Sequence, residues 1–323
     1  MVSAVASAMP VSSASPLVSV VVPVFNAAPF LRTALNSVLA QTYPAFEVIV
    51  VDDGSSDGST QILGAYRDRV RVYEQSRKGA AAARNLGVRH ARGQYIAFQD
   101  ADDYWFPTKL ARQVDHALSN PSHSIVFSQF AYWYPDGNGD YRDPRWFLEH
   151  PETWLVPEPL SGYIYADELL DSLIAMIVPL VHRDVFERLG GFDERLEAGS
   201  DYDFWLRATN RFQAHKIPEC FALYRIHGTG ITGTPRATNF PYVVLKRAVE
   251  TMGLSGPDGR SANAGAVRKR LADTWLNFAL LHLRRGSPTL GREALHKYLA
   301  IARYHPRAMA NYAFVRAQHA LRR

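Results

Sequence analysis

Acidic side chains gather in two short runs of this chain, Asp52-Asp53 and Asp100-Ala101-Asp102-Asp103. Each run directly follows apolar residues that are typical of a buried strand, although one such turn alone is more often a helix N-cap than a binding site. If both runs line one crevice, the carboxylates repel one another and raise each other's pKa values. A divalent cation that prefers oxygen ligands, Mg²⁺ or Mn²⁺, resolves this repulsion and completes its coordination with phosphate oxygens. The pattern therefore predicts a metal-bound nucleoside diphosphate.

The elements that position these carboxylates alternate between strand and helix over the first hundred residues. Predicted strands are β-branched apolar runs, and predicted helices place apolar residues three and four positions apart. The strands are 17–24, 46–51, 70–73 and 95–98, and the helices are 29–41, 60–67 and 79–90. This order predicts an α/β fold, a mostly parallel sheet flanked by helices with a Rossmann-like nucleotide-binding half. Ligands bind such sheets outside the carboxyl ends of the strands, where both acidic runs fall.

The alternation weakens after residue 104. We expect helices at 107–118, 184–189 and 202–210, a strand at 124–134, a long loop at 135–161 and a buried segment at 169–181. From residue 243 onward the pattern is helical, with its strongest stretches at 266–285 and 291–320.

The composition excludes several classes of protein. The chain has 323 residues, of which 47% are hydrophobic and 21% charged, as in globular proteins with a sizeable core. Its single cysteine, Cys220, excludes a disulfide scaffold and a cysteine-based zinc site, and it favours a reducing compartment. No run reaches the roughly 18–20 apolar residues of a membrane-spanning helix. Residues 1–16 read as a disordered tail, because they lack the basic start of a signal peptide.

Positive charge is concentrated near the end of the chain. Residues 240–323 carry 15 Lys or Arg against four acidic residues, whereas the whole chain has a net charge of +5. Such a basic helical region either meets an anionic partner or is a solvated face without one. Aromatic and aliphatic residues in the same segments favour an anionic membrane surface as the partner. Nucleic acid is not expected, because no recognition motif accompanies the charge.

Seven short motifs in fixed order carry a family resemblance. They are Val21-Val-Pro-Val-Phe-Asn, Val51-Asp-Asp-Gly-Ser-Ser-Asp-Gly-Ser, Ala83-Arg-Asn-Leu-Gly, Phe98-Gln-Asp-Ala-Asp-Asp, Gly190-Gly-Phe-Asp-Glu, Gly199-Ser-Asp-Tyr-Asp-Phe-Trp-Leu-Arg and Tyr224-Arg-Ile-His-Gly. Together they resemble the family 2 inverting glycosyltransferases with a GT-A fold. The resemblance divides the chain into a glycosyltransferase domain, 17–235, and a basic helical region, 236–323. Within the domain, 17–104 is the expected nucleotide-sugar half and 105–235 the acceptor half.

The resemblance implies roles for residues on the donor side. Asp53 is similar to the carboxylate that accepts a hydrogen bond from the base ring of a uracil-type nucleotide. Pro23 and Phe25 resemble the strand-end residues that line the base pocket. Arg84 resembles the arginine that steadies the sugar and the acidic loop, with a surface helix arginine as the alternative. Asp100 resembles the first carboxylate of the Asp-x-Asp pair, on the sugar and ribose side.

The remaining roles concern the metal, the diphosphate and the acceptor. Asp102 resembles the metal-binding carboxylate, and His227 completes the metal shell unless it is a plain loop histidine. Arg225 belongs to the element that lies near the diphosphate. Asp201 resembles the general base, although Ser200 replaces the acidic neighbour that the family usually shows. Trp105 is expected near the acceptor. Phe204 and Trp205 are expected in the core, Asp203 on another face of its helix, and Asp103 as a cap of the following helix.

These features predict a metal-dependent inverting transfer of one sugar from a nucleotide-diphosphate sugar, with UDP favoured through Asp53, to a hydroxyl of a saccharide or a lipid-linked saccharide. The expected location is the cytoplasm, including the inner face of the cell membrane. One alternative is a non-catalytic binding protein on the same fold, which the presence of Asp201 disfavours. The other is a sugar nucleotidyltransferase, whose glycine-rich basic loop is absent from Asn26-Ala-Ala-Pro.

Overall fold

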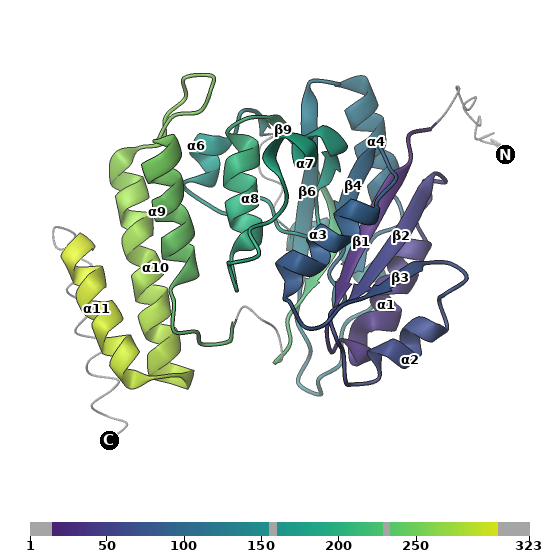
Figure 1. Cartoon of the computed structure of the whole chain (residues 1–323), viewed down its shortest axis with the longest axis horizontal. Helices are drawn as coiled ribbons and strands as arrows, with labels where there is room; N and C mark the ends of the chain where they lie inside the picture. Colours follow the sequence, from purple (N-terminus) through teal and green to yellow (C-terminus); the bar gives the residue numbers. More distant parts are fainter. Residues whose placement is uncertain (1–14, 155–159, 229–232, 303–323) are drawn as a thin grey trace.

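The computed structural model describes residues 15–154, 160–228 and 233–302. Its strands are β1 (Val18–Val24), β2 (Phe46–Asp52), β3 (Arg71–Glu74), β4 (Tyr95–Phe98), β5 (Tyr104–Trp105), β6 (His123–Trp133), β7 (Ser161–Gly162), β8 (Leu180–His182) and β9 (Gln213–Arg225). Its helices are α1 (Ala28–Leu39), α2 (Ser59–Gly64), α3 (Ala80–His90), α4 (Lys109–Ser119), α5 (Arg145–Glu149), the 3₁₀ helix η1 (Pro151–Thr153), α6 (Tyr165–Glu168), α7 (Arg183–Leu189), α8 (Ser200–Thr209), α9 (Phe240–Met252), α10 (Ala264–Arg285) and α11 (Pro288–Ala302). In these residues the strands form one sheet in the order β3-β2-β1-β4-β8-β6-β9-β5, with β7 added beside β9 (Figure 1).

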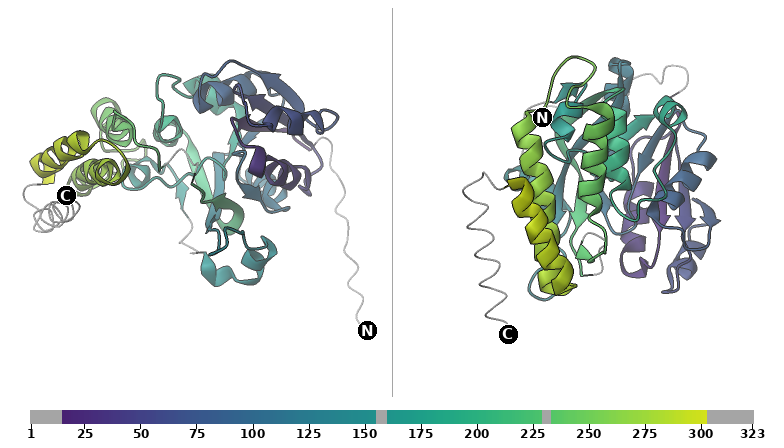
Figure 2. Two further views of the ribbon diagram at one scale, coloured as in Figure 1. Left: turned by 90° about the horizontal axis from the view of Figure 1, so that it is seen from below. Right: turned by 60° about the vertical axis from the view of Figure 1, so that its left-hand side comes forward.

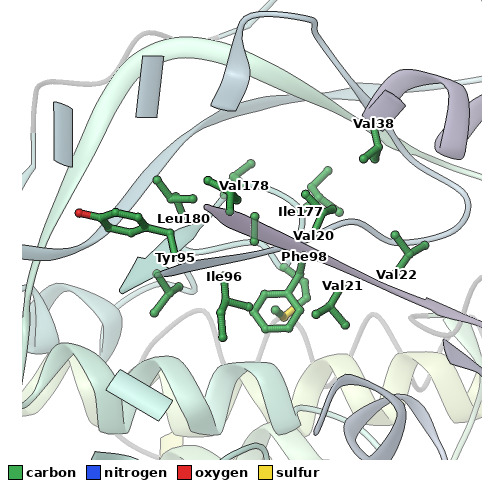
Figure 3. Packing of buried hydrophobic residues seen from close by; sticks show 14 of the residues in the cluster. Val20, Val21, Val22, Val38, Tyr95, Ile96, Phe98, Ile177, Val178 and Leu180 are labelled. Carbon is green, nitrogen blue, oxygen red and sulfur yellow. The ribbon is translucent and has the colours of Figure 1, made fainter. Parts of the chain in front are cut away.

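The first half of the sheet is parallel, as the sequence predicts. β1 pairs with β2 and β4, and β2 pairs with β3, all in the parallel direction. Side chains of β1 alternate between its two faces, so that Val20 and Val22 lie on one side and Val21 on the other (Figure 3). α3 packs closely on this strand, because an added Cβ at Gly87 would lie 2.3 Å from Cγ1 of Val21. This contact fixes the helix that carries Arg84.

The second half of the sheet mixes both directions. β8 is antiparallel to β4 and β6, β9 is parallel to β6, and β5 is antiparallel to β9. The predicted fold class is confirmed, with only parallel pairing among β1, β2, β3 and the β1–β4 pair, and a further parallel pair between β6 and β9. The sequence analysis did not predict β9, a long strand with Pro218 inside it and shifts in its register against β6.

Two of the predictions that differ from the structure concern the segment 135–161 and the start of α8. The segment 135–161 is not wholly a loop, because α5 folds where Phe147 packs with Phe106 and Trp133 in a small apolar cluster. α8 begins at Ser200 instead of residue 202, and Gly199 precedes it at φ 75°, a left-handed conformation that favours glycine. Asp201 therefore lies in the first turn of a helix.

The C-terminal helices pack side by side at the end of the molecule opposite α1 and α2 (Figures 1 and 2). α9 joins a hydrophobic cluster with α6 and α8 that contains Tyr165, Leu206 and Leu245, so it shares a core with the element that carries Asp201. None of the helices in the described residues has the length and apolar character needed to cross a membrane. Residues 1–14 of the expected tail, and the expected helical continuation from 303 to 320, lie outside the described residues.

Candidate active site

Hydrogen bonds to the Asp53 carboxylate hold the acidic turn after β2 in place. Asp53 is buried, and its Oδ1 accepts hydrogen bonds from Nε2 of Gln75 and from the backbone N of Lys78, each at 2.7 Å. Its Oδ2 accepts one from the backbone N of Gly79 at 2.8 Å. Asp53 thus fixes the entry to α3. Because Oδ2 accepts a single hydrogen bond, it keeps acceptor capacity for a ligand N–H.

Phe25 and Pro23 stand beside this turn at the end of β1. The ring of Phe25 is 36% exposed, and the guanidinium carbon of Arg77 lies 4.3 Å from its centroid. Pro23 is half-buried. The backbone N of Asp53 donates to the carbonyl of Val24, so Asp53 and the exposed aromatic ring belong to neighbouring strand ends.

The second part of the β2 motif has a structural role. Side chains of Ser55, Asp57 and Ser59 accept hydrogen bonds from the backbone N–H groups of Asn26, Ala28 and Ala27, at 2.9 to 3.0 Å. These contacts hold the first turn of α1, where N–H groups lack partners within the helix.

Arg84 and Asp100 form an ion pair at the end of β4, with 2.7 Å between Nη2 and Oδ1. The Arg84 side chain is only 9% exposed, so the alternative of a surface arginine is wrong. Burial would lower the pKa of its guanidinium, but the charges of Asp100, Asp201 and Asp102 outweigh this and raise it. Burial raises the pKa of Asp100, and Asp102 and Asp201 add to that rise. Asp102 and Asp201 therefore both act electrostatically on the Arg84–Asp100 pair.

Asp102 and His227 are in direct contact, with 2.9 Å between Oδ2 and Nε2. The Asp102 side chain is 34% exposed, whereas that of His227 is 12% exposed and its ring lies 4.5 Å from that of Phe30. His227 is therefore held beside the acidic turn instead of projecting from a loop. A carboxylate oxygen and an imidazole nitrogen side by side are a donor set that suits Mn²⁺ or Mg²⁺ when phosphate oxygens complete the shell.

Arg225 is buried behind the acidic turn. Its Nε donates to the carbonyl of Asp102 at 2.6 Å, and its guanidinium carbon lies 3.9 Å from the centroid of the Trp133 ring and 4.4 Å from that of Tyr141. Its backbone N donates to Oδ1 of Asp103 at 2.7 Å. The Arg225 side chain thus stabilises the acidic turn through the backbone carbonyl of Asp102.

Asp103 does not cap a helix. Its Oδ1 accepts from Arg225, and the residue at the N-cap of α4 is Thr108. Burial, together with Asp102 and Asp100, raises the pKa of Asp103 well above its ordinary value. Its Oδ2, Nε of Arg84 and both amide atoms of the Gln99 side chain are buried without hydrogen-bond partners in the described part of the chain. Such unpaired groups at the end of a central strand indicate a ligand site.

Asp201 lies in the first turn of α8, and its Oδ1 accepts a hydrogen bond from the backbone N of Tyr202 at 2.8 Å.

Asp203 forms ion pairs with Arg207 and Arg247, as expected for a residue on another face of α8. Hydrogen bonds from Arg195 and Arg247 lower the pKa of Asp193, and this outweighs the rise that burial alone would cause. Asp193 and Asp203 are thus both engaged in ion pairs with arginines. Both line a cavity of about 660 Å³ between the loop after α7 and α9.

Asn85 is a residue that the sequence analysis did not single out, although it stands inside a quoted motif. Its side chain accepts from the backbone N of Phe192 at 2.8 Å, and donates to the Phe192 carbonyl at 2.9 Å and to Oε1 of Glu194 at 2.8 Å. Asn85 thereby joins α3 to the loop that leads to Asp201.

The expected acceptor contact of Trp105 is wrong for this structure. Its side chain is 0% exposed, and its indole N–H donates to the carbonyl of Ile177 at 2.8 Å. β5 pairs with β9 and turns this ring into the core. Phe204 and Trp205 are also buried, as predicted.

Comparison with known proteins identifies the family. The model of glycosyl transferase family 2 matches residues 19–170. The putative teichuronic acid biosynthesis glycosyltransferase TuaG of Bacillus subtilis is 32% identical over 242 residues, which cover 72% of this chain and 89% of TuaG. The chain belongs to glycosyltransferase family 2. An uncharacterized glycosyltransferase of Rickettsia typhi is 31% identical over 222 residues, 68% of this glycosyltransferase and 67% of the relative.

Solved structures agree on the fold of this glycosyltransferase. TarS 1–349 of S. aureus in complex with UDP-GlcNAc superimposes with a TM-score of 0.62 and 17% identity, over 94% of this chain and 88% of TarS. The mannosyltransferase PcManGT of Pyrobaculum calidifontis, in complex with GDP-Man and Mn²⁺, gives a TM-score of 0.61 and 20% identity, over 95% and 88% of the chains. The GT-A fold expected from the motifs is confirmed.

Proposed function

We propose that this glycosyltransferase moves one sugar from a nucleotide-diphosphate sugar, a UDP-sugar in the first place, to an acceptor hydroxyl with inversion at the anomeric carbon. The observation that carries the proposal is the Arg84–Asp100 ion pair and the Asp102–His227 pair at one acidic turn, with the Asp201 carboxylate acting electrostatically on Arg84. UDP-GlcNAc bound to TarS and GDP-Man bound to PcManGT support a nucleotide-sugar donor.

The nucleoside end of the donor is assigned to the strand ends of β1 and β2. The exposed ring of Phe25 offers a surface on which a base can stack, with Pro23 beside it. Asp53 accepts from the base N–H through Oδ2, which holds one hydrogen bond in this structure. A base with an N–H at that position, such as uracil, is favoured over one with an acceptor there.

Asp102 and His227 are the residues that would hold a divalent cation. Their contact brings a carboxylate oxygen and an imidazole nitrogen together at the acidic turn, where the Asp102 side chain is partly exposed. When bound, Mg²⁺ or Mn²⁺ would offset negative charge on the departing nucleoside diphosphate. Arg225 keeps the turn in place through the Asp102 carbonyl. Arg84 fixes Asp100 for hydrogen bonds to the hydroxyls of the sugar or ribose.

Asp201 is assigned as the general base. The acceptor oxygen attacks the anomeric carbon, its proton passes to the Asp201 carboxylate, and the bond from that carbon to the nucleoside diphosphate breaks. A single displacement of this kind inverts the anomeric centre. The proton coupling constants of the new linkage in NMR test this part, because a product that retains the donor configuration would exclude it.

Substitution of Asp201 tests the proposed function. Asp201→Asn is nearly isosteric, so nucleotide affinity should stay within about twofold while turnover falls by roughly 10²–10⁴. Asp184→Asn is the matched control, because Asp184 also lies in the first turn of a helix but is remote from the acidic turns in sequence and exposed. If Asp201→Asn turned over like the wild type, the base would have to be another residue.

For the C-terminal region we propose electrostatic docking on an anionic membrane surface at the inner face of the membrane, near a lipid-linked acceptor. Trp275, Phe278 and Leu283 of α10 pack in one cluster with α11, so the apolar face of the region lies between helices. Exposed cations of these helices remain for the contact, among them Arg268, Lys269, Arg284, Arg285 and Arg292. We retain 236–323 as the boundaries of this region.

A further inference from the structure

Two histidines seven residues apart and a third that is distant in sequence meet near the starts of β6 and β9. His116 lies in the last turn of α4, His123 begins β6, and His215 lies near the start of β9. β6 and β9 run parallel, and Arg225 ends β9 at the acidic turn. The histidine cluster is therefore separated from the acidic turn by most of the length of β9. All three side chains are half-buried, so solvent ions can reach them.

The distances between the rings are those of a compact cluster. One ring nitrogen of each histidine lies within 4.8 Å of the others. Nε2 of His116 and Nδ1 of His123 are 3.2 Å apart, close to the ~3.3 Å between two nitrogens bound to one tetrahedral Zn²⁺ at about 2.0–2.1 Å each. The rings of His116 and His215 stack with 4.0 Å between centroids. Because the terminal torsion of histidine is broad, small ring rotations can direct three nitrogens to one point.

One nitrogen of the cluster lacks a partner. Nδ1 of His215 is buried and has no hydrogen bond in the described residues. An ordinary packing role for the cluster would leave this atom unsatisfied, which costs free energy in a folded protein. By contrast, Nε2 of His123 lies 3.1 Å from Oγ of Ser161, an interaction that orients its ring. A histidine that ligates a metal through one nitrogen is commonly oriented in this way through the other.

The protonation of the cluster is compatible with a metal. Burial lowers the pKa of His116, His123 and His215, that of His215 to about 4. At pH 7 the imidazoles are therefore neutral, and their lone pairs are available.

We propose that His116, His123 and His215 bind a first-row transition-metal dication, Zn²⁺ in the first place, with water as the fourth ligand. Three imidazole nitrogens without a carboxylate suit Zn²⁺ and disfavour Mg²⁺, in contrast to the acidic turn at the other end of the sheet. The ion would link the end of α4 to the starts of β6 and β9. The site is independent of the glycosyl transfer proposed above.

Metal binding to the full chain tests this site. After EDTA treatment and dialysis, Zn²⁺ is titrated with excess Mg²⁺ and UDP present to occupy the acidic turn, and Co²⁺ is used in parallel for its visible absorption in tetrahedral sites. We expect one Zn²⁺ per chain and a tetrahedral Co²⁺ spectrum. His215→Asn and His123→Asn should each weaken Zn²⁺ binding by about 100-fold or more, since even partners behind a ligand contribute 10–100-fold.

Two controls separate the cluster from other sites. His296→Asn removes an exposed histidine of α11, and Asp102→Asn alters the acidic turn; both variants should keep the tight Zn²⁺ site. Folding of each variant is checked by circular dichroism, and a rise of Tm with Zn²⁺ in the wild type but not in His215→Asn would support the site. Zn²⁺ binding that is absent from the wild type, or unchanged in both His215→Asn and His123→Asn, would overturn the proposal.

Discussion

Replacement of Asn85 by alanine tests how the two halves of the glycosyltransferase are joined. The Asn85 side chain makes three hydrogen bonds, two to the backbone of Phe192 and one to Glu194, across more than 100 residues of sequence. Asn85→Ala removes all three and leaves the N–H and carbonyl of Phe192 without these partners. The loop that holds Phe192 continues into α8, so the variant also loosens the support of Asp201.

The magnitude follows from the number and exposure of these bonds. Each neutral hydrogen bond contributes about 1 kcal/mol, and the exposed bond to Glu194 contributes no more, so the unfolding free energy should fall by about 2–3 kcal/mol. At about 2–4 °C per kcal/mol for a domain of roughly 220 residues, this corresponds to a decrease of roughly 4–12 °C in Tm. Turnover should fall while the affinity for UDP stays near that of the wild type, because the lost hydrogen bonds reach Phe192 and Glu194, whereas Asp53 and Phe25 follow β2 and β1.

The assay is thermal unfolding followed by circular dichroism, combined with calorimetric titration of UDP. Asn277→Ala serves as the control, because Asn277 is an exposed asparagine on α10. A Tm for Asn85→Ala within about 1 °C of the wild type would refute the argument, since lost hydrogen bonds of this number cannot leave stability unchanged.

Two further predictions concern pH and membrane binding. Glu168 is fully buried, and burial raises its pKa from 4.5 to about 8, so the folded protein keeps a proton that the unfolded chain loses between these values. The free energy of unfolding should therefore decline as pH rises through this window. Urea unfolding should show a flatter pH profile of this free energy for Glu168→Gln than for the wild type. Identical profiles for the two proteins would contradict the assignment. Vesicles with phosphatidylglycerol should bind the protein at low salt, and Arg284→Gln/Arg285→Gln should weaken this by roughly fivefold per charge. Binding that is absent at low salt, or equal in the double variant, would exclude docking through these arginines.

The elements of residues 17–104 were largely predictable because they depend on local sequence. β1, β2 and β4 are apolar runs buried on both faces, and the acidic runs follow β2 and β4 at once in the sequence. The pairing of strands that are distant in sequence was not predictable. β9 contains Pro218 and irregular register, so its role as the partner of β6 and β5 arises only from tertiary contacts.

The site shows the same division. Asp100 and Asp102 follow one buried strand, and the resemblance places Arg84 of α3 beside them, in agreement with the observed ion pair. The family is confirmed by comparison. Trp105 was misassigned because an aromatic residue after an acidic turn can face either the ligand or the core, and pairing of β5 decides it. Asn85 was missed because its three hydrogen bonds reach residues 192 and 194.

The most direct test of the account is release of nucleoside diphosphate from nucleotide sugars by the full chain, measured with Mn²⁺ and with EDTA. We predict that the wild type releases UDP from at least one UDP-sugar only when the metal is present. Asp102→Ala should lose this release, because its carboxylate and His227 are the proposed cation ligands. Release that persists in Asp102→Ala or in EDTA would contradict the account, as would a wild type that acts on no nucleotide sugar.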